Sequence, residues 1–587
     1  MGIRSLTPPM WLSIATLAWT SPALCAPGTG NWTGAIDGHI VSLVHIEAGP
    51  DGKLIGTFAS HEAPLDAPDV HAQTSPITDI VASPDHLGFS APGLGGHFEG
   101  QWDAAKASWV GIFQWGQWGK GGYKSTLDLK RTDLASLPPA PQPVVYTSPA
   151  DETRALNALV QAWADDGRFM GSVLVMQDSK VLLDKGYGMA DVAKGHPDTP
   201  DTAYHVGSIT KQFTAAAILL LQERGKLKVS DSVRTYLPDA PAAWDQITLF
   251  DLLTHTSGLG DDGDDFTGRW AQDETPAQLW AAIRNEPLKF QPGTQFSYSN
   301  AGYAVLGLVI EKVSGRSYGD FLRDNLFKPL GMTATAYNPP PSPVQARGYE
   351  GSVDGPIPTR NPLALSLGFS AGGIVSTTHD MALWQTKLLG GQVLSPSSLK
   401  QMITPFKENY GFGVWATPRD GHLDINHTGS VPGFHLASHY EPDEKLSVLV
   451  FGNLDTFAPL SLGNDLLLVA RGLPGRLPPK PYPVSPAVLA GYAGTYAISP
   501  NSRVVFTYEN GKLIAQIPEA PDRDAARVEV FASSETLFYS KTWEVATFKF
   551  VRAGDGTFSV VLHHLDGKPD EVGRRQAEGA KTKTDKS

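Results

Sequence analysis

The sequence predicts a multidomain protein in which a central mixed α/β domain lies between two all-β domains. At 587 residues the chain is too long for a single hydrophobic core. Two proline-rich stretches, residues 133–149 and 471–486, have the composition of stiff linkers and separate three large parts. The part between them, residues 150–470, mixes helix and strand patterns, whereas the outer parts show the alternating pattern of short strands between Gly and Asp turns.

The outer parts, residues 27–132 and 487–576, are predicted to be β domains because apolar and polar residues alternate in short segments. These segments are 41–46, 54–58, 97–102 and 109–115 in the first part, and 492–496, 504–508, 512–517, 547–551 and 558–562 in the second. Trp115, Trp118 and Tyr123 are expected to pack in the first sheet, a sugar-binding platform being the less favoured alternative. Residues 577–587 are predicted to form a disordered tail.

The first 26 residues have the pattern of an export signal peptide. Arg4 gives a positive start, residues 10–19 are apolar, and small residues suited to cleavage surround Cys25 and Ala26. The apolar run is too short to cross a membrane, so no transmembrane span is expected. Cys25 is the only cysteine, and the mature chain therefore needs no disulfide in an oxidising compartment. We expect a periplasmic or secreted protein.

Composition argues against several classes of partner and cofactor. The formal charge of −13 and the pI near 5.6 oppose binding to nucleic acid or to an anionic membrane. Histidines gather at positions 422, 427, 435 and 439, but neither a His-Glu-x-x-His helix nor a set of cysteine ligands accompanies them. We therefore expect no metal and no other cofactor. His255 is interpreted as a structural residue that hydrogen-bonds the last carbonyls of a helix.

The central part carries a candidate nucleophile at the start of a helix. Residues 208–225 begin with Ser208, run through Ala and Leu, and stop at a glycine, which is the pattern of a helix. Lys211 follows one turn after Ser208, so the two side chains share a face. The positive N-terminus of the helix favours an alkoxide on Ser208 and disfavours the ammonium form of Lys211. Both effects favour a reactive serine.

A serine three residues before a lysine is a common pattern, and this chain has a second copy at Ser397 and Lys400. There Ser395 or Ser397 is better explained as the cap of an ordinary surface helix. The string Tyr298-Ser299-Asn300 likewise has a rival that ends at Asn510, but the glycine after Asn510 predicts a hairpin turn instead.

Four blocks in a fixed order carry a resemblance to a known family. They are residues 202–215 around Ser208, 247–259, 290–303 around Tyr298 and Asn300, and 427–434. With them, residues 150–470 resemble the serine β-lactamase and penicillin-binding protein superfamily, in the branch of class C β-lactamases, D-alanyl-D-alanine carboxypeptidases, D-aminopeptidases and esterases. The resemblance implies a β-lactamase-like domain in which an antiparallel sheet meets a mostly helical lobe. Residues 173–184 fit its opening hairpin, and residues 446–451 fit a buried strand.

The resemblance also implies a role for each matched residue. Ser208 would attack a carbonyl and form an acyl-enzyme. Lys211 or Tyr298 would take the serine proton, and Tyr298 would later pass a proton to the leaving group. The backbone N–H groups of Ser208 and Ser430 would form the oxyanion hole. The substrate would be bound by Asn300 and by three residues of one strand, His427, Thr428 and Gly429.

His427 departs from the β-lactamase pattern, which has lysine at this position. An imidazole with its ordinary pKa near 6.5 is only partly charged at neutral pH, so it holds a substrate carboxylate less firmly than lysine does. The departure favours a carboxypeptidase, a D-aminopeptidase or an esterase over an efficient β-lactamase.

Two classes of function follow from the sequence. The first is an exported serine hydrolase for a small peptide or ester, with D-amino-acid peptides as the expected substrates. The second is a catalytically silent recognition protein that kept the fold. Residues 487–576 also resemble the lipocalin-like β-barrel that some members of this branch carry, and the β domains could gate the site or assemble the chain into a homo-oligomer.

Overall fold

The computed structural model describes the residues in the following ranges: 29–36, 40–49, 53–62, 74–91, 96–115, 124–132, 144–260, 272–340, 342, 344–352, 355–359, 362–419, 421–456, 458–478, 480–499, 502–518, 527–541, 546–552, 557–564 and 571–576. Several predicted features lie outside these ranges. They are the signal peptide, most of the first linker, the disordered tail, Trp118 and Tyr123. In the described ranges, no helix has both the length and the apolar character needed to span a membrane. The chain divides into two compact units, Met1–Ala140 and Pro141–Ser587.

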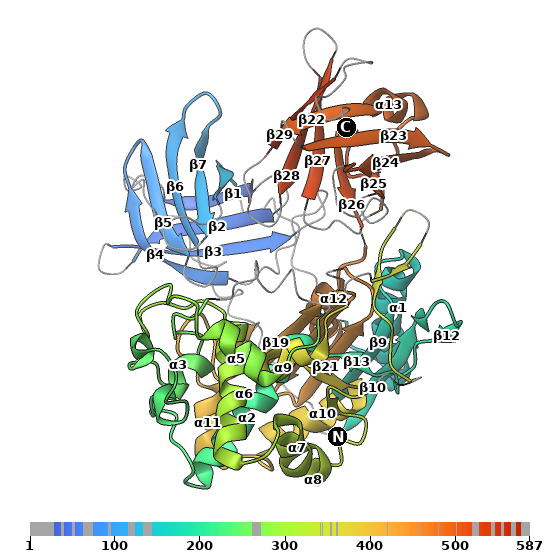
Figure 1. The fold of residues 1–587 in the computed structure, drawn as a ribbon. Coiled ribbons are helices and arrows are strands. Elements are labelled where there is room, and N and C mark those ends of the chain that lie inside the picture. The colour runs from blue at the N-terminus through green and yellow to red at the C-terminus, as the bar shows by residue number, and fades with distance from the viewer. Residues whose placement is uncertain are drawn as a thin grey trace, which may run out of the picture. The chain divides into compact units, whose positions relative to one another are not determined.

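The first unit contains a closed antiparallel barrel of eight strands (Figure 1). Neighbouring strands pair in sequence order, and β1 closes the barrel by pairing with β8. Alternate side chains point inward, so Phe58, Phe89, Phe98 and Phe113 are fully buried in its core. The all-β prediction for this part is confirmed. The strands are β1 (Gly30–Ile36), β2 (Ile40–Ala48), β3 (Leu54–Glu62), β4 (Thr74–Ala82), β5 (His86–Ala91), β6 (Gly96–Asp103), β7 (Ser108–Trp115) and β8 (Lys124–Arg131).

The central part of the second unit contains an antiparallel six-stranded sheet, in the order β10-β9-β21-β20-β19-β18. The predicted hairpin at 173–184 is present as β9 and β10, and the predicted strand at 446–451 is present as the fully buried β21. The strands are β9 (Gly171–Gln177), β10 (Lys180–Tyr187), β18 (Trp415–Arg419), β19 (His422–Val431), β20 (Phe434–Glu441) and β21 (Leu446–Gly452).

Helices cover both faces of this sheet. Val173 and Val175 of β9 pack with α1 (Pro149–Asp165) and α12 (Ala458–Ala470), whereas Leu174 between them packs with the helical lobe on the other face. A strand buried on both faces has a continuous apolar sequence, as β9 and β21 do. The central part is therefore the predicted mixture of an antiparallel sheet and a helical lobe.

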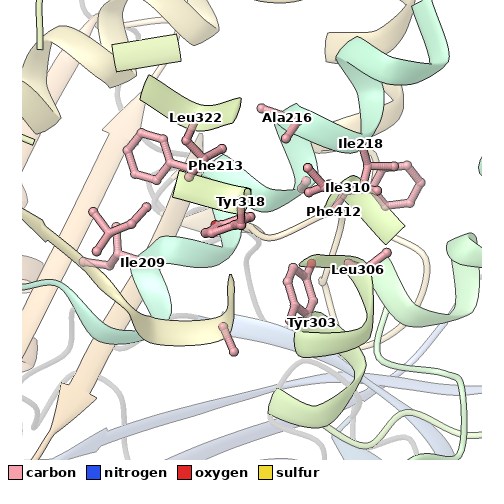
Figure 2. Close-up of a cluster of buried hydrophobic side chains, with 14 of the residues drawn as sticks. Ile209, Phe213, Ala216, Ile218, Tyr303, Leu306, Ile310, Tyr318, Leu322 and Phe412 are labelled. Atoms are coloured by element: carbon pink, nitrogen blue, oxygen red, sulfur yellow. The ribbon is translucent and has the colours of Figure 1, made fainter. Parts of the chain in front are cut away.

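The helical lobe is built around α2 (Thr210–Glu223), α6 (Asn300–Ser314) and α9 (Leu365–Gly372). Figure 2 shows part of its core, in which Phe213 and Ile218 of α2 lie among side chains of neighbouring helices such as Ile310 and Leu322. The other helices are α3 (Leu249–Leu253), α5 (Pro276–Ile283), α7 (Tyr318–Leu322), α8 (Lys328–Leu330), α10 (Thr378–Leu389) and α11 (Pro396–Ile403). The short strands are β11 (Met189–Asp191), β12 (His196–Pro197), β13 (Tyr204–His205), β14 (Ala336–Tyr337), β15 (Tyr349–Glu350), β16 (Ile357–Pro358) and β17 (Ile374–Ser376).

A second closed barrel of eight antiparallel strands follows α13 (Pro486–Tyr492) at the C-terminal end (Figure 1). Tyr496, Phe506, Phe538 and Phe550 fill its core with edge-to-face ring contacts. The predicted β-barrel is present, and its likeness to lipocalins stays a prediction. The strands are β22 (Gly494–Ser499), β23 (Ser502–Glu509), β24 (Lys512–Gln516), β25 (Arg527–Ala532), β26 (Leu537–Ser540), β27 (Ala546–Arg552), β28 (Phe558–His564) and β29 (Glu571–Arg575).

Candidate active site

Ser208 lies in a single 3-10 turn, η4 (Gly207–Ile209), which leads directly into α2. The α-helix therefore begins two residues later than the sequence predicts. Lys211 is in the first turn of α2, and its Nζ donates a hydrogen bond of 3.0 Å to Ser208 Oγ. Ser208 is half-buried, whereas the Lys211 side chain is fully buried. The structure thus brings the predicted nucleophile and the predicted amine into contact.

The buried amine of Lys211 has two further partners. Its Nζ donates to Asn300 Oδ1 at 2.6 Å and to the carbonyl oxygen of Ala371 at 3.0 Å. Three acceptors match the three protons of an ammonium group, so a buried cation is fully satisfied here. Asn300 is therefore a direct partner of Lys211, besides any contact it makes with substrate.

The carbonyl of Ala371 is a part of the site that the sequence did not predict. It comes from the end of α9, where Phe369 interrupts the helix with φ 37° and ψ −131°. A non-glycine residue in this conformation costs on the order of 1–3 kcal/mol. The turn is held because the Ser370 carbonyl accepts from Thr214 Oγ1 at 2.6 Å and Ser370 Oγ donates to the Tyr303 carbonyl. A backbone acceptor has no residue-type signature, so only the fold could reveal it.

Tyr298 and Asn300 are brought to Lys211 by the start of α6. Ser299 is the N-cap of this helix and accepts from the Gly302 N–H at 3.0 Å, and Asn300 is the first helical residue. The ring centroid of Tyr298 lies 4.7 Å from Lys211 Nζ. Such a cation stabilises the deprotonated phenol that a proton-accepting tyrosine requires.

His255 holds this segment in place, but not in the way that the sequence predicts. Its ring does not bond the last carbonyls of α3; Nδ1 instead accepts from the Ser299 N–H at 3.0 Å, and its carbonyl accepts from the Ser297 N–H. The ring lies 4.3 Å from the ring of Tyr298 and 4.6 Å from that of Tyr410. Burial keeps the pKa of His255 well below its ordinary value, so the ring is neutral and Nδ1 is free to accept.

Replacing His255 tests this positioning role. Because His255→Leu removes the acceptor for the Ser299 N–H, we expect kcat to fall about 10- to 100-fold while KM changes little, as for a displaced catalytic group. His255→Asn keeps a short acceptor and should recover part of kcat. Steady-state kinetics on the two variants, with thermal unfolding as a check on folding, decides the point. Equal loss in both variants would contradict a role for the Nδ1 acceptor.

His427 is buried on β19 and forms two hydrogen bonds. Nδ1 donates to the Thr428 carbonyl at 2.7 Å, because a carbonyl can only accept, and Nε2 lies 3.2 Å from the hydroxyl of Tyr410. Burial and the nearby charge of Lys211 lower the pKa of His427 to about 3. The expectation of a partly charged imidazole at neutral pH is therefore wrong: His427 is uncharged there.

The pH dependence of the site follows from this value. A base whose pKa falls from about 6.5 to about 3 on folding stays neutral in the native protein from pH 8 down to pH 5. We expect the profile of kcat/KM against pH to show no inflection near pH 6.5 that is caused by His427. The profile of His427→Gln should therefore have the same shape as that of the native protein. Stability should instead decrease as pH falls below 6.5, since the unfolded chain binds the proton first. Rate profiles and thermal unfolding between pH 4 and 8 measure the two effects.

The strand that carries His427 packs its backbone against the turn that carries Ser208. The ladder of β19 with β18 ends at Asn426, so among the described residues no strand pairs with residues 427–431 on that side. A Cβ on Gly429 would lie 2.1 Å from the Val206 carbonyl, and one on Gly207 would lie 3.1 Å from the Ser430 nitrogen. Thr428 and Ser430 are exposed. The predicted oxyanion residues are therefore adjacent, and their role stays a prediction.

Gly429 is required by this close approach. We expect Gly429→Ala to push β19 away from the Val206 carbonyl, because the added atom would meet backbone at 2.1 Å. A loss of about 1–3 kcal/mol in stability and at least a 10-fold loss in kcat should follow. Gly491→Ala is a matched control, since nothing described lies within 4 Å of a Cβ there. Equal effects of the two variants would contradict the close contact.

The two rival motifs have ordinary structural roles, as predicted. Ser395 caps α11 by accepting from the Ser398 N–H, and the side chains of Ser397 and Lys400 are exposed on the outer face of this helix. Asn510 and Gly511 both have positive φ and form the two-residue turn between β23 and β24.

One group of metal-ligating side chains is present among the described residues. His422, Asp443 and Glu444 have ligand atoms within 4.8 Å of one another. His422 Nδ1 pairs with Asp443, and Glu444 accepts from the amide of Gln177. Existing hydrogen bonds at the sheet surface therefore account for this group.

Comparison with known proteins agrees with the fold of the central part. The family model described as Beta-lactamase matches residues 156–471, which is more than half of the 587-residue chain. PbpX of Bacillus subtilis (strain 168) is 34% identical over 316 residues, covering 53% of this chain and 77% of PbpX. Penicillin-binding protein 4* of the same strain is 28% identical over 457 residues, covering 72% of this chain and 99% of that protein.

Among solved structures, the octameric penicillin-binding protein homologue from Pyrococcus abyssi shares the fold, with a TM-score of 0.50 and 23% identity over 72% of this chain and 99% of the homologue. The matched region contains the sheet, the helical lobe and every residue of the site described above. This chain belongs to the beta-lactamase family.

Proposed function

We propose that this chain is an exported serine hydrolase that works through an acyl-enzyme on Ser208 and cleaves peptide bonds, chiefly in D-amino-acid peptides, or ester bonds. The observation that carries the proposal is the 3.0 Å hydrogen bond from the buried Lys211 Nζ to Ser208 Oγ. A half-exposed hydroxyl beside a buried amine is the arrangement that nucleophilic catalysis requires.

The reaction divides into two displacements. Ser208 Oγ attacks the carbonyl carbon as its proton passes to Lys211 in its neutral form or to Tyr298 in its deprotonated form. The developing oxyanion is stabilised by the backbone N–H groups of Ser208 and Ser430. The tetrahedral intermediate collapses, and the amine or alcohol leaves with a proton. Water then attacks the acyl-enzyme, releases the acid and returns the proton to Ser208.

The uncharged His427 favours a peptidase, an amidase-type activity or an esterase over a β-lactamase. Recognition of a carboxylate gains most from a charged partner, and a ring with a pKa of about 3 provides no charge at neutral pH. A catalytically silent recognition protein is the alternative. The intact contacts among Ser208, Lys211 and Asn300 disfavour it, because a protein that only binds has no need of a buried amine on a serine.

Export and assembly complete the proposal. The pattern of residues 1–26 supports secretion or a periplasmic location, with cleavage near Cys25. The two barrels offer surfaces through which copies of the chain could assemble. Analytical ultracentrifugation of the mature chain measures the oligomeric state, and N-terminal sequencing of the exported protein locates the cleavage site.

A fluorophosphonate probe tests the central claim. We expect one covalent adduct per chain, located by peptide mass spectrometry on Ser208. Steady-state assays with a D-Ala-D-Ala peptide, nitrocefin and a p-nitrophenyl ester then rank the substrate classes. An absence of labelling at Ser208 would overturn the hydrolase proposal. Fastest turnover of nitrocefin would overturn the argument drawn from His427.

A further inference from the structure

The Ser430 side chain is the first member of a relay of three hydrogen-bonded side chains that the proposed mechanism does not use. Its Oγ lies 2.8 Å from Nδ1 of His435, and Nε2 of His435 lies 2.6 Å from Oδ1 of Asp455. Ser430 and His435 are opposite each other across the β19–β20 hairpin, so their side chains project from the same face of the sheet. His435 is buried, whereas Ser430 is exposed at the edge of β19.

Asp455 is fixed in its position by the backbone around it. Its N–H donates to the Tyr349 carbonyl at 2.8 Å, and its Oδ2 accepts from the Gly433 N–H at 3.5 Å. Gly433 has φ 82° in the tight turn between β19 and β20, a conformation that favours glycine. The turn therefore brings the Asp455 carboxylate, the His435 imidazole and the Ser430 hydroxyl into one chain of hydrogen bonds.

The order of the relay fixes the direction of its hydrogen bonds. With a single ring proton on His435, that proton lies on Nε2, because the Asp455 carboxylate can only accept, and Nδ1 is left as an acceptor. Ser430 must then donate its hydroxyl proton to Nδ1. The hydroxyl consequently presents only lone pairs to the surroundings of the strand edge, and it is an acceptor toward any ligand that lies there.

Ser430 is also close to the nucleophile. Its backbone nitrogen lies 3.1 Å from the position of a Cβ on Gly207, the residue before Ser208. A substrate acylating Ser208 and lying along the edge of β19 therefore passes within reach of the Ser430 side chain. The negative charge of Asp455 disfavours a substrate carboxylate beside the Ser430 side chain. The uncharged ring of His427, on the same strand, does not attract a carboxylate either.

We propose that Ser430 Oγ is a hydrogen-bond-accepting subsite, set by His435 and Asp455, that selects substrates presenting an ammonium or amide N–H group over substrates presenting a carboxylate. The inference rests on the proposed hydrolase function and specifies its substrate class. His435 and Asp455 are positioning residues in this scheme. Of the three residues of the relay, only Ser430 touches the substrate.

Two matched series of substrates test the subsite on either side of the scissile bond. On the acyl side they are D-alanine p-nitroanilide and its N-acetyl and N-succinyl derivatives; on the leaving-group side they are N-acetyl-D-alanyl-D-alaninamide and N-acetyl-D-alanyl-D-alanine. In at least one of the two series, kcat/KM should be about 10-fold higher for the substrate that presents an N–H donor than for the substrate that presents a carboxylate. A preference for the carboxylate in both series would overturn the proposal.

Variants assign that preference to the relay. Ser430→Ala should reduce kcat/KM about 10-fold more for the donor substrates than for the carboxylate substrates. His435→Gln should lower the ratio of the two classes without abolishing turnover, because the hydroxyl is then free to donate outward. Ser397→Ala, at an exposed serine on α11, is the matched control. Equal loss on every substrate in Ser430→Ala would contradict the subsite.

A binding experiment separates this inference from the hydrolase proposal. In Ser208→Ala, calorimetry with D-alanine p-nitroanilide measures affinity without turnover, and Ser208→Ala/Ser430→Ala gives the contribution of the hydroxyl. We expect about 10-fold weaker binding in the double variant, and equal affinity would contradict the subsite. Fluorophosphonate labelling of Ser208 in the native chain reports on the hydrolase function alone.

Discussion

Ser208→Ala should abolish covalent labelling and reduce kcat on the order of 10⁵-fold or more. The substitution removes the only atom through which the proposed acyl-enzyme can form, so the reaction reverts to direct attack by water. The effect on stability should be small, because Ser208 is half-buried and the substitution removes a single hydroxyl, which accepts from Lys211 Nζ. Stopped-time assays at high enzyme concentration, together with intact-mass measurement after exposure to the probe, give both quantities.

The chain supplies its own control for this experiment. Ser397 and Lys400 repeat the spacing of Ser208 and Lys211 on the exposed helix α11. Ser397→Ala should leave kcat and labelling unchanged. If labelling persisted in Ser208→Ala and were lost in Ser397→Ala, the nucleophile would be Ser397 on α11. That outcome would refute the proposed site.

Lys211→Met should reduce kcat about 10³- to 10⁴-fold, the range for loss of a positioned proton-transfer group. The substitution keeps the length of the side chain but removes the donor to Ser208 Oγ, and it leaves Asn300 Oδ1 and the Ala371 carbonyl without this partner. A buried acceptor that loses its partner costs about 1–3 kcal/mol, so thermal stability should also fall. Kinetics and thermal unfolding on the same preparation separate the two effects.

Lys400→Met is the matched control, because Lys400 is exposed and repeats only the spacing. It should change neither kcat nor the melting temperature measurably. If Lys211→Met kept more than a tenth of the native kcat while remaining folded, the amine would not be the group that activates Ser208, and Tyr298 would become the sole candidate base.

The sequence predicted the architecture well because each element depends on local patterns. Alternating apolar residues predict four of the eight strands of the first barrel and five of the eight strands of the second. The apolar run after Ser208 predicts α2, although the helix begins at Thr210. The rivals of the catalytic motifs were also resolved by local chemistry, through the cap at Ser395 and the turn at Asn510. That both β regions close into barrels depends on the pairing of their first and last strands, β1 with β8 and β22 with β29, and no local pattern specifies such a pairing.

The protonation of the site lay beyond the sequence. The ordinary pKa of an imidazole predicts partial charge on His427, whereas burial near Lys211 lowers the pKa to about 3. His255 was expected at helix carbonyls and instead accepts from Ser299, 44 residues away in sequence. Both outcomes depend on which groups the fold places around a ring, and desolvation and long-range partners leave no trace in the neighbouring residues.

By itself the sequence identified the family and the candidate nucleophile, amine, phenol and amide, since four ordered blocks carry the resemblance and residue types carry their own chemistry. The tertiary structure decided what state these groups are in. It supplied the Ala371 carbonyl that completes the shell of Lys211, the burial that neutralises His427, and the line from Ser430 through His435 to Asp455. Reactivity is encoded locally in side chains, but the electrostatic environment that selects one protonation state and one hydrogen-bond direction comes from segments that meet only when the chain folds.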